Sequence, residues 1–532
     1  MKKSVEYLIY AICGALMALP YPVGSLWFVA WIAFIPVIVL EYKRERNTKH
    51  PLLTAYRHGM AFFYPYGIVT LYWFAELYPL DFAGLTKGAA LCVVILGIFG
   101  LSLLQAIFWS FMFVVNDLLI RKCRLVSSKA LSIFVPAFLW VVFEWMQAQT
   151  WAGVPWGKLA LGQSSLRALI QSSSILGPYF VSFVIILFAS LCASAIMTIR
   201  EHNVRSGVLS LAMALLLFAS NLTFGLIRIN AVESSDEGRT ITAAAIQGNI
   251  SSVDKWSGDS FSKTLEAYEE ETRKAAEEGA ELVVFPETVL PYTLLEFESL
   301  TDYVYDLALD NNVTILVGAF YRNDSGNLEN SIFLVGPDGT ISDTHYSKRH
   351  LVPFGEFVPM RDIVMTLVPP LNDIGMLDDD LTPGTSSSLF DSGSGRLGSL
   401  ICFDSIYEVL ARDSAYDGAE LLCISTNDSW FNDSAAVYEH NSHSVLRAVE
   451  TGKYVVRAAN TGISSVISST GKVIDMLPPL VRGHVTAQVR LSDTLTVYDR
   501  VGNVIVPVCA VMTVLSAVWL TVKNKRSNGH NN

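Results

Sequence analysis

Three residues whose types can cooperate in nucleophilic catalysis follow apolar stretches in the second half of the chain. Glu287 stands in VVFPETVLP, Lys348 in HYSKRHLVPFGEFVP and Cys402 in SLICFDSIYEVLA. A cysteine thiolate is a nucleophile, a carboxylate in an apolar setting can take the thiol proton, and a lysine can stabilise an oxyanion. The three residues therefore predict covalent catalysis through Cys402, provided that the fold brings them together.

Each of these residues also has a plainer interpretation. Glu287 could cap a helix or lie on the surface, and Lys348 could be a solvated loop lysine like its neighbour Arg349. Cys402 could fill a core at a strand end, or form a disulfide with Cys423 in an oxidising compartment. Taken singly, the three stretches do not decide between these alternatives.

Neighbouring residues are expected to support the three candidates. Glu356 lies in VPFGEFVP, whose prolines and glycine indicate a rigid loop that would hold this carboxylate near the site. Phe403 and Asp404 directly follow Cys402 and are expected to support the nucleophile. No pair of cysteines has the CxxC spacing of a zinc site, so no metal is expected.

The region around these residues, 229–498, reads as strands alternating with helices. Strand-like strings recur, among them TITAAAIQ, AELVVFPE, NVTILVGAF, SIFLVGPDG and AELLCISTND. Residues 260–278 and 440–454 have the charge and spacing of helices, and Asp338-Gly339 and Thr470-Gly471 mark hairpin turns. This alternation predicts a layered α/β domain.

The rest of the chain has the composition of a membrane protein. The 532 residues are 52% hydrophobic and 16% charged, whereas about 25% of residues are charged in typical soluble domains. We expect about eight transmembrane helices within 1–228 and 499–532, the latter ending in a short tail. A cleaved signal peptide is the alternative for the first run, although no clear cleavage site follows it. The apolar runs, each near the roughly 20 residues that cross a bilayer, lie at about 5–20, 22–41, 54–76, 88–116, 130–147, 172–199, 206–226 and 501–522.

Basic residues predict the orientation of these helices. With the N-terminus in the cytoplasm, every basic cluster between or beside the runs also falls on the cytoplasmic side. Both termini are then cytoplasmic, and residues 229–498 lie on the outer face of the membrane. The clusters are Lys2 and Lys3; Lys43, Arg44, Arg46 and Lys49; Arg121, Lys122, Arg124 and Lys129; Arg200 and Arg205; and Lys523, Lys525 and Arg526.

Three aromatic residues are candidates for contact with lipid or substrate. Trp256 stands in NISSVDKW, and Trp430 and Phe431 stand in NDSWF. Aromatic side chains favour the membrane interface, although ordinary packing is the alternative for each. The net charge of −11 argues against nucleic acid as a partner.

The order and context of the three candidates resemble the carbon–nitrogen hydrolase (nitrilase) superfamily, whose active site is a Glu-Lys-Cys triad. FPET, SKRHLVPFGE and ICFD resemble its three motif blocks. Together with the flanking membrane runs, the whole chain resembles the apolipoprotein N-acyltransferase family, and NDSWF with RAVETGKYVVRAANTGISSVI is similar to that family's late block. Asp404 stands where the family commonly has Glu, Asn432 replaces a Gly, and Glu439-His440 stands at a Gln-His pair.

This resemblance implies a fold, a reaction and partners. The fold is a polytopic helical membrane domain with an outer α/β domain of the nitrilase-like αββα type. The reaction moves an acyl chain from a membrane phospholipid, through a thioester on Cys402, to the N-terminal amine of a diacylated apolipoprotein. No cofactor is implied, and the location is the bacterial cytoplasmic (inner) membrane.

Two other functions remain open from the sequence. A membrane-anchored nitrilase-type amidohydrolase would pass the thioester to water instead of an amine. A transporter or assembly protein with an inactive nitrilase domain would need no triad. Transporters commonly carry charged residues within the membrane, and this chain has few of them, such as Glu76 and Glu144.

Overall fold

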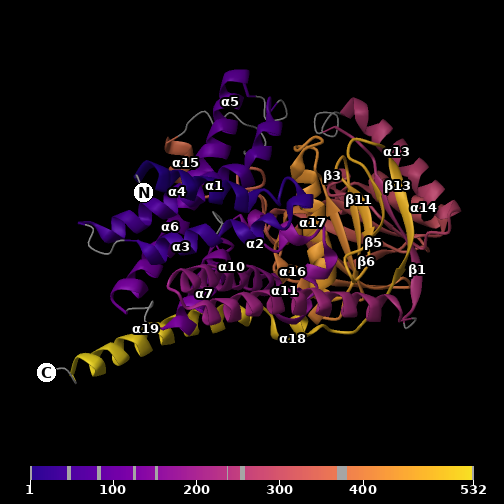
Figure 1. Ribbon diagram of the computed structural model, residues 1–532. Helices are drawn as coiled ribbons and strands as arrows, with labels where there is room; N and C mark the ends of the chain where they lie inside the picture. Colours follow the sequence, from indigo (N-terminus) through magenta and orange to yellow (C-terminus); the bar gives the residue numbers. More distant parts are fainter. Residues whose placement is uncertain are drawn as a thin grey trace. The chain divides into compact units, whose positions relative to one another are not determined.

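The computed structural model describes residues 3–44, 49–80, 85–123, 128–149, 154–235, 238–251, 258–367 and 380–529 (Figure 1). The chain divides into two compact units. The helical unit comprises residues 1–74, 94–230 and 503–532, and the α/β unit comprises residues 75–93 and 231–502. All strands in the described ranges belong to the α/β unit.

Long apolar helices dominate the chain outside the strands. Within the described ranges, five helices are long and apolar enough to cross a membrane by length and composition. They confirm the expectation of several membrane-spanning helices in this part of the chain. The first of these helices combines α5 (Lys87–Ile95), η4 (Leu96–Gly100) and α6 (Leu101–Arg121) without a break. The other four are α7 (Lys129–Gln147), α10 (Pro178–Arg200), α11 (Val204–Glu233) and α19 (Ile505–Gly529, with the apolar part ending at Lys523).

Three of the expected runs form shorter or less apolar helices. The run expected at 22–41 is divided into α2 (Val29–Ala33) and α3 (Ile35–Lys43), where Pro36 in the first turn of α3 lacks the N–H that a continuous helix needs. The other two runs form α1 (Lys3–Ala18) and α4 (Pro51–Thr70). The count of eight transmembrane helices therefore stays a prediction.

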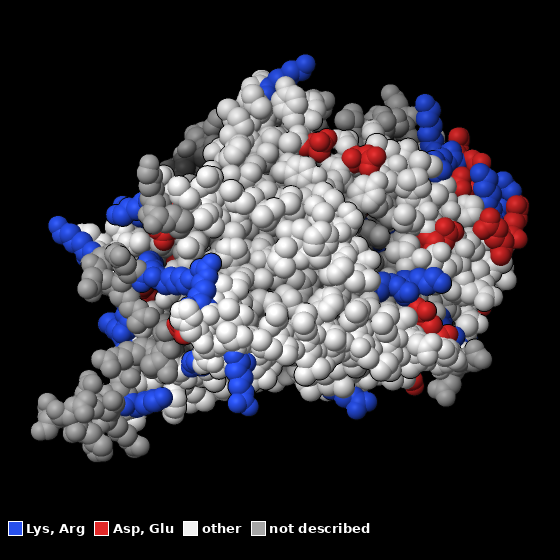
Figure 2. Space-filling model, viewed as in Figure 1, with Lys and Arg blue, Asp and Glu red and all other residues white. Residues whose placement is uncertain are grey.

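Basic side chains gather at one end of the helical unit. Figure 2 shows a broad uncharged face over these helices, with Lys and Arg at the end where the C-terminus lies. Basic residues at or near helix ends include Lys43, Arg121, Arg200, Arg205 and Lys523. This is the arrangement that the positive-inside rule describes, and the orientation it predicts remains a prediction.

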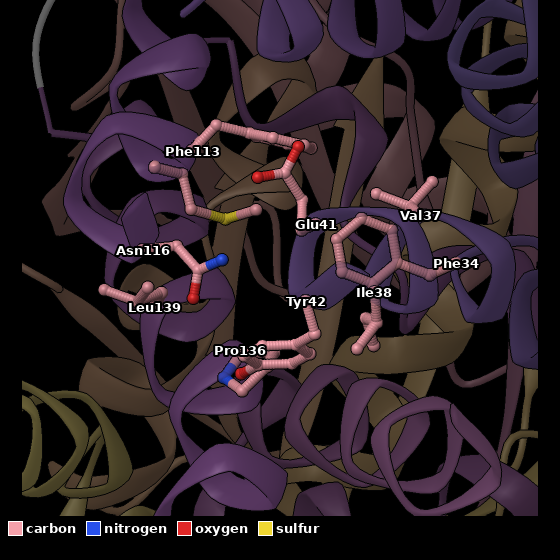
Figure 3. Close-up of a pocket in the computed structure, with 10 residues that line it drawn as sticks. Phe34, Val37, Ile38, Glu41, Tyr42, Phe113, Asn116, Pro136 and Leu139 are labelled. Atoms are coloured by element: carbon pink, nitrogen blue, oxygen red, sulfur yellow. The ribbon is translucent and has the colours of Figure 1, made fainter. Parts of the chain in front are cut away.

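A buried polar cluster joins three helices of the helical unit. Glu41 on α3 accepts a hydrogen bond from the Tyr10 hydroxyl of α1 at 2.7 Å, and its carboxylate lies 2.8 Å from Nδ1 of His58 on α4. A hollow of about 20 Å³ beside Glu41 is lined mostly by apolar side chains and by Asn116 (Figure 3). It has room for about one water molecule, so it is too small for an organic substrate.

Two mixed β-sheets form the middle of the α/β unit. The larger sheet has the order β13-β1-β2-β4-β5-β6, with β3 also paired to β4, and the smaller has the order β12-β11-β10-β9-β8-β7. The bounds are β1 Thr240–Gln247, β2 Leu282–Val284, β3 Leu290–Thr293, β4 Thr314–Arg322, β5 Leu328–Val335, β6 Ile341–Ser347, β7 Leu389–Ser392, β8 Gly395–Ile401, β9 Leu421–Thr426, β10 Tyr454–Ala459, β11 Ser464–Ile467, β12 Val473–Leu477 and β13 Gly483–Arg490. The main helices are α13 Gly258–Glu277, α14 Glu298–Asn311, α16 Glu408–Tyr416 and α17 Ala435–Thr451.

The sheets and helices form four layers. One apolar core fills the space between the sheets, and a second lies between the larger sheet and helices α13 and α14. Along β1, Ala243 and Ala245 enter the first core while Ala244 and Ile246 enter the second, because successive strand side chains point to opposite faces. Helices α16 and α17 pack on the smaller sheet, and Figure 1 shows the two helix pairs on opposite sides of the strands. The αββα sandwich predicted for this domain is confirmed.

The local signals in the sequence mark several of these elements. The helix expected at 260–278 corresponds to α13, and the two predicted turns join β5 to β6 and β11 to β12. The helix expected at 440–454 begins earlier, at Ala435, because Ser434 caps it by accepting a hydrogen bond from the Ala436 amide at 3.3 Å.

Candidate active site

The three candidate side chains follow strands that end at one edge of the sandwich. Glu287 follows β2, Lys348 directly follows β6, and Cys402 directly follows β8. Two antiparallel pairings, β4 with β5 and β5 with β6, give β6 the same direction as β2, which is parallel to β4. The two sheets are tied at this edge, where the Ser425 hydroxyl of β9 donates to the Phe285 carbonyl oxygen at 2.8 Å.

The buried Glu287 carboxylate is held on both of its oxygens. Oε1 accepts hydrogen bonds from Nζ of Lys348 at 2.8 Å and from Nδ2 of Asn330 at 2.7 Å. Oε2 accepts from the backbone N–H of Asn427 at 3.0 Å. Glu287 is only 6% exposed and lies in a turn, so neither the surface nor the helix-cap interpretation describes it.

Lys348 is buried between two carboxylates. Besides Glu287, its Nζ donates to Oε1 of Glu356 at 2.9 Å. Burial lowers the pKa of Lys348, but the charges of Glu287 and Glu356 outweigh this and raise it well above its ordinary value. The side chain is therefore a fixed positive charge and not a solvated loop lysine.

Glu356 lies beside the same lysine, as expected of a supporting residue. Its Oε1 accepts from Nδ2 of Asn330 at 3.0 Å, and its Oε2 accepts from the backbone N–H of Val352 at 2.8 Å. Burial raises the pKa of Glu356 and Glu287 raises it further, while Lys348 opposes both effects. Two carboxylates and one ammonium thus share a closely coupled site.

Cys402 has a backbone conformation that is unusual for its residue type. It is the first residue of η11 (Cys402–Ile406), and its φ of +47° lies in the left-handed region. Burial and the charge of Glu287 raise the pKa of the Cys402 thiol, while Lys348 lowers it. The net rise means that the resting group is a thiol, which needs a base to become a nucleophile.

Asp404 ties the cysteine turn to the segment after Lys348. Its carboxylate accepts hydrogen bonds from the backbone N–H groups of Ile401 at 3.2 Å and His350 at 2.8 Å, and from the Tyr346 hydroxyl at 2.8 Å. Burial raises the pKa of Asp404, with Lys348 and these donors opposing the rise. An aspartate is long enough to make this connection, and the residue supports both candidate side chains through the backbone.

A second buried polar group, which includes Asp428 and His440, lies near Cys402. Nδ1 of His440 on α17 lies 2.8 Å from Oδ1 of Asp428, whose Oδ2 accepts from Arg457 at 2.8 Å. His440 and Arg457 hold the pKa of Asp428 below its ordinary value even though burial raises it. Cys402, Asp428 and His440 place possible ligand atoms within 4.8 Å of one another. Because Arg457 already neutralises the carboxylate, a hydrogen-bond network describes these residues better than a metal site does.

The aromatic candidates have mixed outcomes. Trp430 and Phe431 are half-buried in the turn after β9, and Phe403 is half-buried with its ring 5.6 Å from that of Tyr407. Trp256 lies outside the described residues. Contact of these rings with lipid or substrate stays a prediction.

The remaining alternatives for Cys402 can be compared with the structure. Cys402 and Cys423 are both free thiols, so the disulfide considered for them is not present. Cys423 lies inside β9, where its side chain enters the core between the sheets. Asn432 has a φ of +48°, which explains why a residue tolerant of that conformation stands where the family commonly has Gly.

Several residues of the site were not predicted from the sequence. Asn330 on β5 donates to both Glu287 and Glu356, and only its position inside an apolar strand could have drawn attention to it. Asn427 and Asp428 contact Glu287 and His440, and neither contact was predicted.

Comparison with known proteins defines first the class of this chain. Residues 242–498 match the family model described as carbon-nitrogen hydrolase, and residues 13–191 match the one described as apolipoprotein N-acyltransferase N-terminal domain. The chain is thus of the class that combines a helical N-terminal domain with a carbon–nitrogen hydrolase domain in one sequence. Nit3 of Saccharomyces cerevisiae is a nitrilase-superfamily member of known structure that is 19% identical to this chain, with a TM-score of 0.38. The match covers 47% of this chain and 90% of the Nit3 chain.

Full-length relatives then define the particular family. The chain is 32% identical to the apolipoprotein N-acyltransferase of Geobacter metallireducens over 514 residues, 95% of this chain and 93% of that protein. It is 27% identical to that of Gloeobacter violaceus, over 95% of this chain and 92% of the relative. The chain belongs to the apolipoprotein N-acyltransferase family, which confirms the resemblance seen in the sequence. It is a membrane-bound bacterial acyltransferase within the carbon–nitrogen hydrolase superfamily.

Proposed function

We propose that this protein transfers an acyl chain from a membrane phospholipid to the N-terminal amine of a diacylated apolipoprotein. The observation that carries the proposal is the arrangement of Glu287, Lys348 and Cys402, in which Lys348 Nζ lies 2.8 Å from Glu287 Oε1 and the charges of both residues act on the Cys402 thiol. The substrates are inferred from the family to which the chain belongs, and the reaction is inferred from the residues of the site.

The first half-reaction forms a thioester on Cys402. Glu287 takes the thiol proton, and the thiolate attacks the carbonyl carbon of a phospholipid ester. The Lys348 ammonium and the Phe403 backbone N–H stabilise the oxyanion. The carbon–oxygen bond then breaks, the leaving alkoxide takes the proton from Glu287, and a lysophospholipid departs.

The second half-reaction transfers the acyl chain to an amine. The free α-amine of the diacylglyceryl-cysteine attacks the thioester carbonyl, and Glu287 takes a proton from the nitrogen. The carbon–sulfur bond breaks, the sulfur recovers a proton, and an amide forms on the lipoprotein. No outside energy source is needed, since the phospholipid ester is already activated.

The proposed location follows from the charge distribution. The α/β unit would lie on the outer face of the cytoplasmic membrane, between α11 and α19, with both termini in the cytoplasm. The basic residues at helix ends support this orientation. Both substrates are lipid-anchored, so an active site tethered at membrane height can reach them.

Intact-protein mass spectrometry tests the proposal. Detergent-purified protein is incubated with a phospholipid and no acceptor, and we expect an added acyl mass that Cys402→Ala abolishes. A diacylated lipopeptide with a free N-terminus should discharge the adduct. Discharge by water alone would instead support an amidohydrolase, and a folded protein without any adduct would refute the proposal.

A further inference from the structure

Two polar side chains converge on the backbone carbonyl of Cys402. The Ser405 hydroxyl donates to this oxygen at 2.7 Å, and Nε2 of His440 lies 3.2 Å from it. The same Nε2 lies 3.0 Å from the Ser405 hydroxyl. Ser405 and His440 are fully buried, so water does not compete for these contacts.

The surroundings of His440 indicate where its protons lie. Its Nδ1 faces Asp428, which can only accept when ionised, so Nδ1 carries a hydrogen. The Ser405 hydroxyl donates to the Cys402 carbonyl, and a hydrogen on Nε2 would point at the oxygens of both groups. The buried Arg457 and the Thr426 hydroxyl, 3.1 Å from the carboxylate, hold Asp428 in place beside His440.

The position of Asp428 is fixed by packing as well. A Cβ atom placed on Gly462 would lie 2.2 Å from Oδ2 of Asp428, which is closer than any real contact. The glycine in the RAANTG stretch therefore makes room for the carboxylate that orients His440. Asp428 and Arg457 have no exposed surface, and the group is a rigid support.

Holding the carbonyl of Cys402 also orients the next N–H. The peptide unit is planar and trans, so the Phe403 N–H points away from the direction of the Cys402 carbonyl. With φ of Cys402 at +47°, this peptide plane has a conformation that the chain alone disfavours. The contacts of Ser405 and His440 on the carbonyl oxygen restrain this peptide plane.

We propose that His440 and Ser405 are positioning residues that aim the Phe403 N–H at the oxyanion of the acyl-transfer reaction. The Asp428–Arg457 pair holds the imidazole of His440 for this task. The inference rests on the proposed function, because it assigns an oxyanion donor to that reaction. Asp404 has a different role, since it holds the peptide before Cys402 and the segment after Lys348.

Two rates measured on the same variants test this assignment. The first is acyl-thioester formation on Cys402 from phospholipid in a single turnover, which passes through an oxyanion. The second is alkylation of Cys402 by iodoacetamide at the same pH, which does not. His440→Ala should slow acylation about 100-fold, which is the effect of losing one oxyanion donor. The same variant should slow alkylation by less than about threefold.

Three further variants sharpen the experiment. Ser405→Ala, a small change that keeps His440, should slow acylation about tenfold with alkylation unchanged. His440→Gln keeps a side-chain N–H and should recover part of the loss. His443→Gln, the same substitution one turn further along α17 and equally buried, should change neither rate.

The outcomes separate this inference from the proposed function. Equal slowing of acylation and alkylation in His440→Ala and Ser405→Ala would show a general loss of cysteine reactivity and overturn the positioning role. Unchanged acylation in both variants would overturn it as well. Failure of the unsubstituted protein to acquire an acyl group would instead refute the proposed function itself.

Discussion

At the scale of single residues, the candidate site is defined by one thiol, one ammonium and two carboxylates in a buried setting. Lys348 is shared by Glu287 and Glu356, and the net effect on Cys402 is a raised pKa of its thiol. The cysteine is therefore protonated at rest and becomes reactive only when a base takes its proton. A protonated thiol is less easily oxidised than a thiolate.

The raised pKa of Cys402 predicts the pH dependence of its alkylation. The thiolate is the reactive form, and a free cysteine has a pKa of about 8.5. In the folded protein the rate of alkylation by iodoacetamide should therefore keep rising above pH 9 and not level off near 8.5. Stopped samples analysed by mass spectrometry from pH 6 to 10 give this profile. A plateau below pH 8 would contradict the protonated resting state.

Asn330 is predicted to orient both carboxylates. Asn330→Leu removes the donor that contacts Glu287 and Glu356 while keeping a similar volume. We expect kcat to fall about 10- to 100-fold, since two charge-assisted hydrogen bonds are lost at the base. The protein should still fold, as judged by its thermal melt. An unchanged kcat would show that Lys348 and Asn427 are enough to orient the Glu287 carboxylate without Asn330.

At the scale of elements, close packing between strands fixes the turn that carries Glu287. A Cβ atom on Gly318 of β4 would lie 2.5 Å from both the Pro286 carbonyl oxygen and the Thr288 amide nitrogen. Gly318→Ala should displace this turn and lower kcat at least about tenfold, because a base must lie within hydrogen-bond reach. Gly393→Ala, where nothing lies within 4 Å, is the matched control and should keep full activity. Equal activity of the two variants would show that the turn adapts.

A buried acid near the end of the α/β unit predicts a pH-dependent stability. Asp499 lies in α18 (Val497–Val501), and burial raises its pKa to about 6. Because this is above the unfolded value of about 3.9, the carboxylate costs stability as the pH rises from 4 to 6, about 2–3 kcal/mol when complete.

Asp499→Asn tests this cost, since the amide oxygen can still accept the hydrogen bond from Thr496. Relative to the unsubstituted protein, the variant should melt at a higher temperature at pH 8, with the difference largely lost at pH 4.5. Differential scanning fluorimetry in detergent measures both. A difference independent of pH would contradict the raised pKa.

At the scale of the whole molecule, the basic helix ends predict which side of the membrane each segment faces. Ser325→Cys in the exposed β4–β5 turn should react with a membrane-impermeant maleimide in intact cells. Asn203→Cys, exposed between α10 and α11, should react only after permeabilisation. Cys92, an exposed native cysteine, is replaced by Ser in both proteins. The reverse labelling pattern would invert the proposed orientation.

The amino-acid sequence by itself determined the elements and the reactive groups. Apolar runs near the length of a bilayer predicted membrane helices, and apolar strings followed by turn residues predicted strands that end at Glu287, Lys348 and Cys402. These are local properties, because hydropathy and turn propensity are carried by neighbouring residues. The division of the run at 22–41 was missed because a single proline within an apolar stretch has no fixed outcome.

Only the tertiary structure decided which residues surround the reactive groups. Asn330 reaches Glu287 because β5 packs into the same sheet, and His440 reaches the Cys402 carbonyl because α17 packs over the smaller sheet. The pKa values of Lys348 and Cys402 depend on burial and on charges far apart in the chain. Contacts across such separations are set by packing, which no local pattern records, and they convert three separate residues into one candidate site.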